Sequence, residues 1–477
     1  MKKLLCSILA CLMLAGCAAP GGTSSSGSAS SGGASSSAVD QSTPAPPEKA
    51  FKTEPIDFTW KPVVYSDYQR QGRPPETEQF YRDFVNAVMK GETVVSCENE
   101  KTAENMLPIL QNIFPVINGI SCEFEYRDGA VHISYYDSDA EREQTIAEFG
   151  RRIEELVEQA VCKGDTPTMA AVALYHNLSN GVTYDHEALE QENQDGSMDV
   201  TPYRALMTGE GICQSFGPAY AYLCMQLGIN AIEAEGWDYN EENGHSWTML
   251  ELNGHHYFAD PTFENGSGGG GLRYFGQNSE ARAQDNYLLK DVGLGFNLMR
   301  AEEFDLSDDS FAPLWDVQNI YDICRTDRGM EIKCHSSFPA QRRIPIEDGK
   351  RILVTPCDDN GVPLEDEGNT PPADDRYAPI LEDPKGTAWS GAAFDVAFLD
   401  SGLVWVESAD FTGPAQYWLT DEGRLFAEIH MTEDMEFYRE SDDRMILKSE
   451  DGEFPLTKAS AEVYERLSKQ SEEYWKN

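Results

Sequence analysis

Apolar residues recur along the chain at two different spacings, and these spacings predict where helices and strands lie. In the region 51–165, Phe80, Phe84 and Val88 recur at every fourth position, which is typical of one buried helix face. The acidic stretch 141–161 also has its large apolar residues on one side. We therefore expect two amphipathic helices in this region.

Turn residues divide other parts of the pattern into short strands. Asp128 and Gly129 lie between two alternating stretches within residues 122–136, which indicates a hairpin. From about residue 315 onward, short β-type runs are separated by Gly, Asp and Pro. These runs are "KRILVTP", "AAFDVAFL", "GLVWVES" and "LFAEIHM". A last helix is expected to begin near Ser460.

Together these elements predict an α+β protein with several units. A small N-terminal α/β region spans 51–165, a core that carries the motifs spans 166–300, and a β-rich accessory domain with a C-terminal helix spans 315–477. About 430 residues follow the N-terminal segment, which is long for one hydrophobic core, so two or three domains are expected. The sequence contains no internal repeat.

The first residues have a pattern of their own. Two lysines precede an apolar stretch that is shorter than the roughly 20 residues needed to span a membrane. The stretch ends in Leu14, Ala15, Gly16 and Cys17, which resembles a bacterial lipoprotein box. This resemblance implies removal of a signal peptide, residues 1–16, and attachment of lipid to Cys17. An ordinary secretory signal is the alternative.

Residues 17–50 consist mainly of Gly, Ser, Ala and Pro, with few large apolar side chains. Such a segment cannot bury enough apolar surface to fold, so we expect a disordered tether. With lipid on Cys17, the protein would be anchored to the cell membrane on its extracytoplasmic face.

The charge of the chain excludes one class of partner. There are 37 Lys and Arg against 82 Asp and Glu, a formal net charge of −45, which argues against nucleic acid. The acidic residues are spread along the chain, so we expect them to form a solvated surface. A cationic substrate is the other interpretation.

The cysteines suggest thiol chemistry rather than a disulfide framework. Three of the eleven, Cys6, Cys11 and Cys17, belong to the leader and its processing site. The other eight permit disulfides, but their spacings do not repeat in this long chain. Since there is no Cys-x-x-Cys or His-Glu-x-x-His pattern, we expect no metal and no cofactor.

One cysteine lies at the start of a predicted helix. After Gly211, apolar residues recur every three or four positions up to Leu227, and Gly228 supplies a C-terminal cap. Cys213 is in the first turn, where unpaired N–H groups and the helix dipole favour a thiolate. Cys224 lies in the middle of the helix and is expected to be a small core residue.

The stretch "GHSWTMLELNGHHYFADPTF" predicts a second hairpin. Asn253 and Gly254 form its two-residue turn, so Leu252 should face His255. His255 then points to the other face from His245, and His256 lies at the far end of the hairpin. Both are expected to be surface or packing residues.

Counting back from this turn places a possible base beside a carboxylate. Trp247 should pair with Asp260, and His245 with Thr262. His245 and Asp260 are then diagonal neighbours on one face, about 7 Å apart at Cβ. An imidazole and a carboxylate can meet across that separation, which would supply a general base and the group that orients it.

Cys213, His245 and Asp260 occur in the contexts Gly-x-Cys, His-Ser-Trp and Asp-Pro-Thr. These motifs resemble the core of the transglutaminase-like superfamily over about residues 165–290. The similarity also includes Tyr184-Asp185, Tyr203 and Leu227-Gly228-Ile229. One departure is Ser215, where many members have glycine. The resemblance implies a papain-like fold with a cysteine at a helix start and a His-Asp hairpin.

The resemblance implies a cysteine peptidase or amidase that acts on extracytoplasmic proteins or peptides. Cys213 would be the nucleophile, with its own N–H as an oxyanion donor, His245 the general base and Asp260 the orienting acid. The candidates for substrate binding or the oxyanion site are Gln214, Trp247 and Tyr203. Gln214 is also explained as a solvent-facing helix residue, and Trp247 as a core aromatic.

Two alternatives stay open. A protein-glutamine cross-linking transglutaminase would pass the acyl group to an amine, and a non-catalytic cell-surface module would only bind. The glycine-rich stretch "ENGSGGGGLRYF" after Asp260 suggests a mobile loop that does not exclude water. This feature favours hydrolysis.

Overall fold

The computed structural model describes most of the chain between residues 53 and 474. The described ranges are 53–195, 199–237, 244–266, 270–284, 292–295, 299–326, 328–336, 341–358, 360–364, 380, 384–399, 403–408, 412–419, 425–429, 433–449 and 452–474. The predicted signal peptide, Cys17 and the predicted tether lie outside the described residues. Within these ranges, no helix combines the length and the apolar character needed to cross a membrane.

The N-terminal region is a three-stranded sheet, in the order β1-β3-β2, packed beside helices. Its elements are α1 (Asp67–Gln71), α2 (Pro75–Lys90), β1 (Val94–Ser96), α3 (Glu100–Met106), η1 (Leu107–Ile109), α4 (Leu110–Ile113), η2 (Pro115–Gly119), β2 (Cys122–Arg127), β3 (Ala130–Tyr135) and α5 (Asp139–Ala160). Both predicted helices are present as α2 and α5. The predicted hairpin is confirmed, since Asp128 and Gly129 have the positive φ angles, 53° and 75°, of its two-residue turn. Ser138 and Glu141 cap α5 reciprocally.

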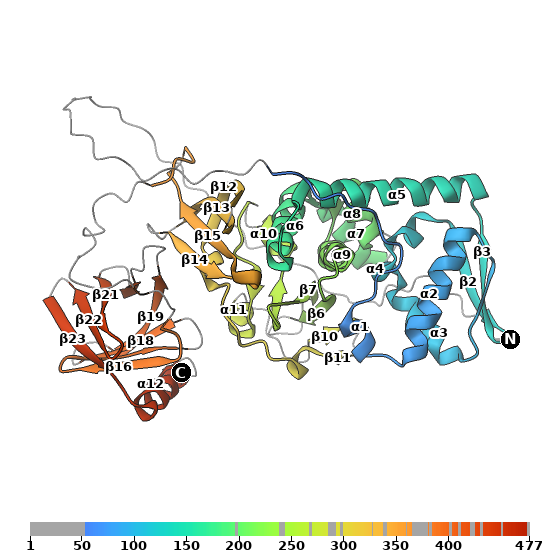
Figure 1. Cartoon of the computed structure of the whole chain (residues 1–477). Helices are drawn as coiled ribbons and strands as arrows, with labels where there is room; N and C mark the ends of the chain where they lie inside the picture. Colours follow the sequence, from blue (N-terminus) through green and yellow to red (C-terminus); the bar gives the residue numbers. More distant parts are fainter. Residues whose placement is uncertain are drawn as a thin grey trace, which may run out of the picture.

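The central unit is a six-stranded antiparallel sheet in the order β11-β10-β6-β7-β8-β9, covered by helices (Figure 1). Its elements are α6 (Pro167–Gly181), β4 (Thr183–Tyr184), α7 (His186–Asp195), α8 (Pro202–Thr208), β5 (Glu210–Gly211), α9 (Cys213–Gln226), β6 (Ala231–Trp237), β7 (Gly244–Leu252), β8 (His255–Ala259), α10 (Pro261–Gly266), β9 (Phe275–Gln277), α11 (Ser279–Gln284), β10 (Gly293–Leu294), β11 (Met299–Arg300), η3 (Ala301–Glu303) and η4 (Ala312–Leu314). The helix predicted after Gly211 is α9, and it packs on β6 and β7.

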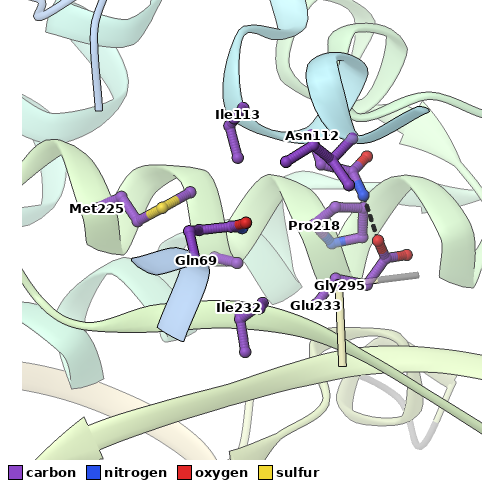
Figure 2. A pocket seen from close by; sticks show the side chains of 10 residues that line it. Gln69, Asn112, Ile113, Pro218, Met225, Ile232, Glu233 and Gly295 are labelled. Carbon is purple, nitrogen blue, oxygen red and sulfur yellow. Dashed lines mark hydrogen bonds between the residues drawn. The ribbon is translucent and has the colours of Figure 1, made fainter. Parts of the chain in front are cut away.

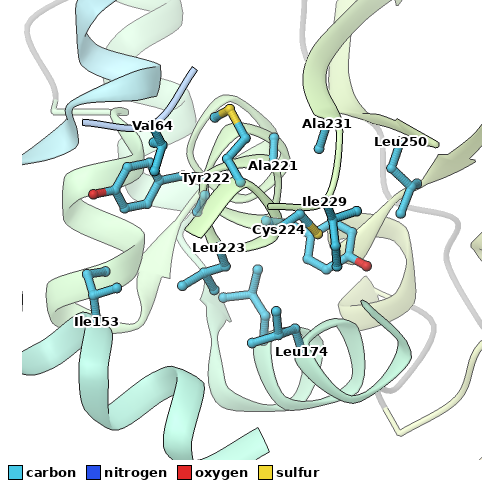
Figure 3. Close-up of a cluster of buried hydrophobic side chains, with 14 of the residues drawn as sticks. Val64, Ile153, Leu174, Ala221, Tyr222, Leu223, Cys224, Ile229, Ala231 and Leu250 are labelled. Carbon is cyan, nitrogen blue, oxygen red and sulfur yellow. The ribbon is translucent and has the colours of Figure 1, made fainter. Parts of the chain in front are cut away.

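One hydrophobic cluster joins the N-terminal region to the central unit. Figure 3 shows part of it, with Leu223 and Cys224 of α9 near Ile153 of α5, Leu174 of α6 and Leu250 of β7. Cys224 has no exposed surface, so the prediction that it is a core residue is confirmed. The two regions therefore share one hydrophobic core.

The C-terminal part contains two different β units. A sheet in the order β12-β13-β15-β14 shares the central cluster through Ile332, Ile344 and Val354. Eight further strands close a barrel with its own apolar interior, which lies at one end of the molecule (Figure 1). The last helix packs on its outside, where Leu467 meets Trp405. The elements are β12 (Val317–Thr326), β13 (Gly329–Ser336), β14 (Arg342–Pro345), η5 (Glu347–Gly349), β15 (Arg351–Pro356), β16 (Thr387–Gly391), β17 (Phe394–Phe398), β18 (Leu403–Ser408), β19 (Thr412–Leu419), β20 (Leu425–Ile429), β21 (Glu433–Ser441), β22 (Arg444–Ser449), β23 (Gly452–Lys458) and α12 (Ala461–Tyr474).

The four quoted β-type runs and the last helix are therefore present. The sequence predicts one β-rich domain where the structure has a sheet and a barrel, because strands in either have the same alternating pattern. Barrel closure depends on the pairing of β16 with β23, which are separated by about sixty residues in sequence and leave no local signal.

Candidate active site

Cys213 is the first residue of α9 and is buried, with 3% of its surface exposed. The start of the helix is held by Ser215, whose Oγ accepts a hydrogen bond from the N–H of Ile212 at 3.3 Å. The same hydroxyl donates to the carbonyl of Val200 at 2.8 Å. The serine at this position therefore fixes the geometry of the turn that presents Cys213.

A glycine brings α9 close to the strand β7. A Cβ atom at Gly217 would lie 2.9 Å from the main chain of Trp247, so only glycine allows this approach. The Thr248 hydroxyl donates a hydrogen bond to the Gly217 carbonyl at 2.7 Å. The helix and the strand are thus in direct main-chain contact.

The connection after α9 decides which end of β7 lies near Cys213. The helix ends at Gln226, and a short turn leads to Ala231, which pairs with Leu250 near the end of β7. The C-terminus of α9 is therefore at the end of β7. Cys213 accordingly lies toward the beginning of β7, where His245 is the second residue.

The hairpin of β7 and β8 forms as predicted. Asn253 and Gly254 have φ angles of 53° and 78°, and Leu252 pairs with His255. His255 is exposed, and His256 Nδ1 lies 2.7 Å from the hydroxyl of Tyr68, so His256 has a packing role.

The far end of the hairpin differs from the prediction. The ladder ends at the pair Thr248–Ala259, and the predicted pairings of Trp247 with Asp260 and of His245 with Thr262 do not form. The reason is that α10 begins directly after Asp260. Oδ1 of this aspartate accepts hydrogen bonds from the N–H groups two and three residues later, both at 3.0 Å, as at a helix N-cap.

His245 and Asp260 nevertheless meet, although the two strand pairs from which their diagonal placement was predicted do not form. Nε2 of His245 lies 2.6 Å from Oδ2 of Asp260, and the two side chains have 0% and 1% of their surface exposed. With Nε2 directed at the carboxylate, Nδ1 is the other ring nitrogen of His245.

The structure adds a cation to this pair. Nη2 of Arg282, from α11, lies 2.7 Å from the same Oδ2 of Asp260, and the arginine has no exposed surface. Burial by itself would raise the pKa of Asp260. The positive partners His245 and Arg282 and the hydrogen bonds to the carboxylate outweigh this effect and lower the pKa to about 2. Sequence reasoning missed Arg282, because no local motif marks it.

Aromatic rings surround the imidazole of His245. Trp247 stacks on it with centroids 5.7 Å apart and an interplanar angle of 23°, and Phe263 stacks at 4.4 Å and 20°. Trp247 is fully buried, which fits its interpretation as a core aromatic, and it packs over the imidazole. The sequence did not single out Phe263.

The other two binding candidates lie in different surroundings. Gln214 is half-buried at the second position of α9. Tyr203 stacks on Phe149 of α5 at 5.7 Å, and a Cβ atom at Gly119 would lie 2.4 Å from its ring. These contacts account for Tyr203 as a packing residue between the N-terminal helices and α8.

Most other cysteines are disfavoured as nucleophiles. All eight cysteines of the described ranges are thiols rather than disulfides. Burial raises the pKa of Cys224, Cys122 and Cys334 to about 12 and that of Cys324 to about 11. Burial also raises the pKa of Cys97 and Cys357.

A buried carboxyl group lies under α9. Glu233 of β6 accepts hydrogen bonds from Ser246 at 2.9 Å and from Asn112, beside a cavity of about 10 Å³ between α9 and β6 (Figure 2). Such a space holds about one water molecule. Burial and the neighbouring Glu235 raise the pKa of Glu233 well above its ordinary value.

The expectation of a mobile loop after Asp260 is wrong for the residues that the structure describes. Leu272 and Phe275 have no exposed surface and Tyr274 has 8%. The N–H of Leu272 donates to the carbonyl of Val317 of β12 at 3.1 Å. Glycines allow this close packing, since a Cβ atom at Gly271 would lie 2.6 Å from Val317 O. Residues 267–269 of the stretch lie outside the described ranges.

In the part of the chain that the structure describes, no group of three or more His, Cys, Asp and Glu side chains is placed to hold a metal ion.

Cys213, His245 and Asp260 lie within the match to one protein-family model. Residues 154–261 match the transglutaminase-like superfamily. The chain thus contains a transglutaminase-like domain, and the resemblance stated from its motifs is confirmed for this region. The matched range ends one residue after Asp260.

Solved structures and curated proteins give the remaining comparisons. The chain resembles a crystal structure described as a TGase at 16% identity and a TM-score of 0.23, covering 30% of this chain and 44% of that one. It also resembles a protein from Cytophaga hutchinsonii assigned as a cysteine protease, at 15% identity and a TM-score of 0.20, covering 31% of this chain and 63% of that one. No curated protein matches the chain.

Proposed function

We propose that the protein is a thiol enzyme that cleaves amide or peptide bonds through Cys213, His245 and Asp260. The observation that carries this proposal is the buried 2.6 Å contact between His245 and Asp260 at the end of β7 toward which α9 presents Cys213. A helix start favours the thiolate, and an oriented imidazole supplies the base.

In the proposed reaction, Sγ of Cys213 attacks the amide carbonyl carbon while Nδ1 of His245 takes the thiol proton. The tetrahedral oxyanion is stabilised at the start of α9, where the N–H of Cys213 is a donor. The C–N bond breaks, the imidazolium returns its proton to the leaving amine or ammonia, and a thioester remains. Water, deprotonated by the imidazole, then releases the acid and the thiol.

A second candidate is transfer of the acyl group from Cys213 to an amine, which would cross-link proteins. The enclosure of the site favours it, because the triad residues are 1–4% exposed and aromatic rings lie against His245. Amine transfer requires that water be kept from the thioester. The packed residues 270–275 add to this enclosure, so this stretch no longer favours water as the acceptor.

The proposed site of action is the extracytoplasmic face of the cell membrane. The motif at Cys17 and the Ser/Gly-rich segment after it support anchoring by an N-terminal lipid. The substrate would be a protein or peptide outside the cell.

The test uses casein as a glutamine-bearing protein, with excess fluorescent cadaverine and product analysis by mass spectrometry. Hydrolysed or deamidated products that depend on Cys213 support the hydrolase, and the variant Cys213→Ala is the blank. Cadaverine adducts in excess would establish transfer instead. A wild-type protein that yields neither product, and whose Cys213 is unreactive toward alkylating agents, would be a binding module.

A further inference from the structure

Arg282 is built into the candidate site from a position that the matched family region does not include. It lies in the first turn of α11, where Asn278 Oδ1 accepts the N–H of Ala281 at 2.8 Å and Asn278 O accepts the N–H of Arg282 at 3.0 Å. This cap fixes the main chain of Arg282 relative to the sheet edge at β9. The placement is therefore set by local structure as well as by the ion pair.

The contacts of Arg282 repeat those of His245. Its Nη2 and Nε2 of His245 both lie on Oδ2 of Asp260, at 2.7 and 2.6 Å. Its guanidinium carbon lies 4.6 Å from the ring centroid of Trp247 and 4.9 Å from that of Phe263, and both rings also stack on the imidazole. Two cations or cation-forming groups thus share one carboxylate oxygen against the same pair of rings.

We propose that Arg282 is a positioning residue for the reaction, acting on His245 through Asp260. The positive charge of Arg282 keeps the carboxylate of Asp260 ionised, and its hydrogen bond keeps Oδ2 beside Nε2 of His245. The same charge also weakens the stabilisation of the His245 imidazolium by Asp260. This inference rests on the proposed function. The fully buried guanidinium requires the carboxylate in return, because an unpaired buried charge is strongly unfavourable.

The other charged or titratable groups near Asp260 do not replace Arg282. The Tyr175 hydroxyl of α6 lies 2.9 Å from Asp260 O, to which it donates, and 3.2 Å from Oε2 of Glu264 in α10. Burial raises the pKa of Glu264 to about 7 and that of Tyr175 well above its ordinary value. Below neutral pH both groups are mostly neutral, so Arg282 and His245 are the cationic partners that keep Asp260 ionised.

The test is the rate of Cys213 alkylation by iodoacetamide as a function of pH from 4 to 9. In Arg282→Gln, the effect of burial on Asp260 is no longer offset by the arginine, so Asp260 protonates within this pH range. The pH at which the labelling rate falls to half on the acid side should therefore rise by at least about one pH unit. Arg342→Gln is the matched control, because Arg342 is a buried arginine paired with Asp316 outside the site. Its profile should coincide with that of the wild type.

Arg282→Lys keeps the charge but loses the planar fork and its stacking. In this variant the alkylation rate should fall at about the same acidic pH as in the wild type. Its maximum rate should be about tenfold lower, because Asp260 is less well oriented. If Arg282→Gln does not fold, the maximum alkylation rate of Arg282→Lys tests the positioning role instead. A folded Arg282→Lys with the wild-type plateau would overturn the proposal.

The outcomes separate this proposal from the proposed function. Wild-type Cys213 that reacts no faster than Cys224 contradicts the function itself. The other outcome is a normal wild-type profile with the same pH dependence in Arg282→Gln, whose alkylation rate is lower at every pH only in proportion to its folded fraction. This result contradicts the role of Arg282 and leaves the proposed function standing.

Discussion

Asp260 receives hydrogen bonds at both carboxylate oxygens, two from main-chain N–H groups at Oδ1 and two from His245 and Arg282 at Oδ2. In Asp260→Asn, the amide N–H₂ group would replace the acceptor at one of these positions. Because the main chain needs an acceptor, the N–H₂ would face His245 and favour the tautomer with its proton on Nδ1. That tautomer cannot accept the thiol proton.

We expect Asp260→Asn to lower kcat/KM for amide cleavage about 10²- to 10⁴-fold. Kinetics with casein, measured beside thermal unfolding, check this expectation. Asp316→Asn is the control, since it removes the partner of a different buried arginine, Arg342. A folded Asp260→Asn protein with activity within tenfold of the wild type contradicts the orienting role.

At the scale of elements, the contact between α9 and β7 sets the position of the thiol. Gly217→Ala would place a Cβ atom 2.9 Å from the main chain of Trp247, which cannot move without shifting the strand. We expect this overpacking to lower the free energy of unfolding by about 1–3 kcal/mol and to reduce activity further by moving Cys213.

Urea unfolding and activity of Gly217→Ala should be compared with those of Gly181→Ala. Gly181 lies at the end of α6 and has no atom within 4 Å of an added Cβ, so its replacement should be neutral or slightly stabilising. Equal stability of the two variants would show that the close approach at Gly217 is not required.

The same elements show what the sequence could reveal. The Asn253-Gly254 turn fixes the register of the hairpin as far as the pair Thr248–Ala259, and this local signal was enough to predict that His245 and Asp260 lie near one another. It did not reveal that α10 starts after Asp260 and ends the ladder. Arg282 reaches the site through the fold of β9 and α11, so its role depends on tertiary contacts that no spacing encodes.

At the scale of the whole molecule, buried acids make stability depend on pH. Burial raises the pKa of Glu264 from 4.5 to about 7. The folded state therefore holds this proton at pH values where the unfolded chain has released it, and the stabilising effect is lost as pH rises from 4.5 to 7. The glutamine side chain of Glu264→Gln does not titrate, so this variant does not lose unfolding free energy in this way as pH rises.

Relative to the wild type, Glu264→Gln should gain on the order of 3 kcal/mol in unfolding free energy between pH 5 and pH 8. Urea unfolding at both pH values measures the change, and Glu104→Gln serves as the control because Glu104 is exposed. A difference between Glu264→Gln and the wild type that does not vary with pH would rule out titration of Glu264 in this range.

Anchoring is also a property of the whole chain. Cys17→Ala should leave unprocessed precursor or release the protein from the membrane fraction, because the lipid-bearing residue is lost. Fractionation and immunoblotting distinguish these results, with Cys11→Ala as the matched change inside the leader. Normal processing and retention of Cys17→Ala would remove the lipoprotein interpretation.

The central claim is that Cys213 is a nucleophile activated by His245. The most direct measurement is iodoacetamide labelling of the native protein at pH 6, quantified for each cysteine by peptide mass spectrometry. Our prediction is that Cys213 is labelled ahead of Cys224 and every other thiol, and that His245→Gln slows this labelling at least about tenfold. Equal labelling of Cys213 and Cys224, or a Cys213 rate that His245→Gln leaves unchanged, would contradict it.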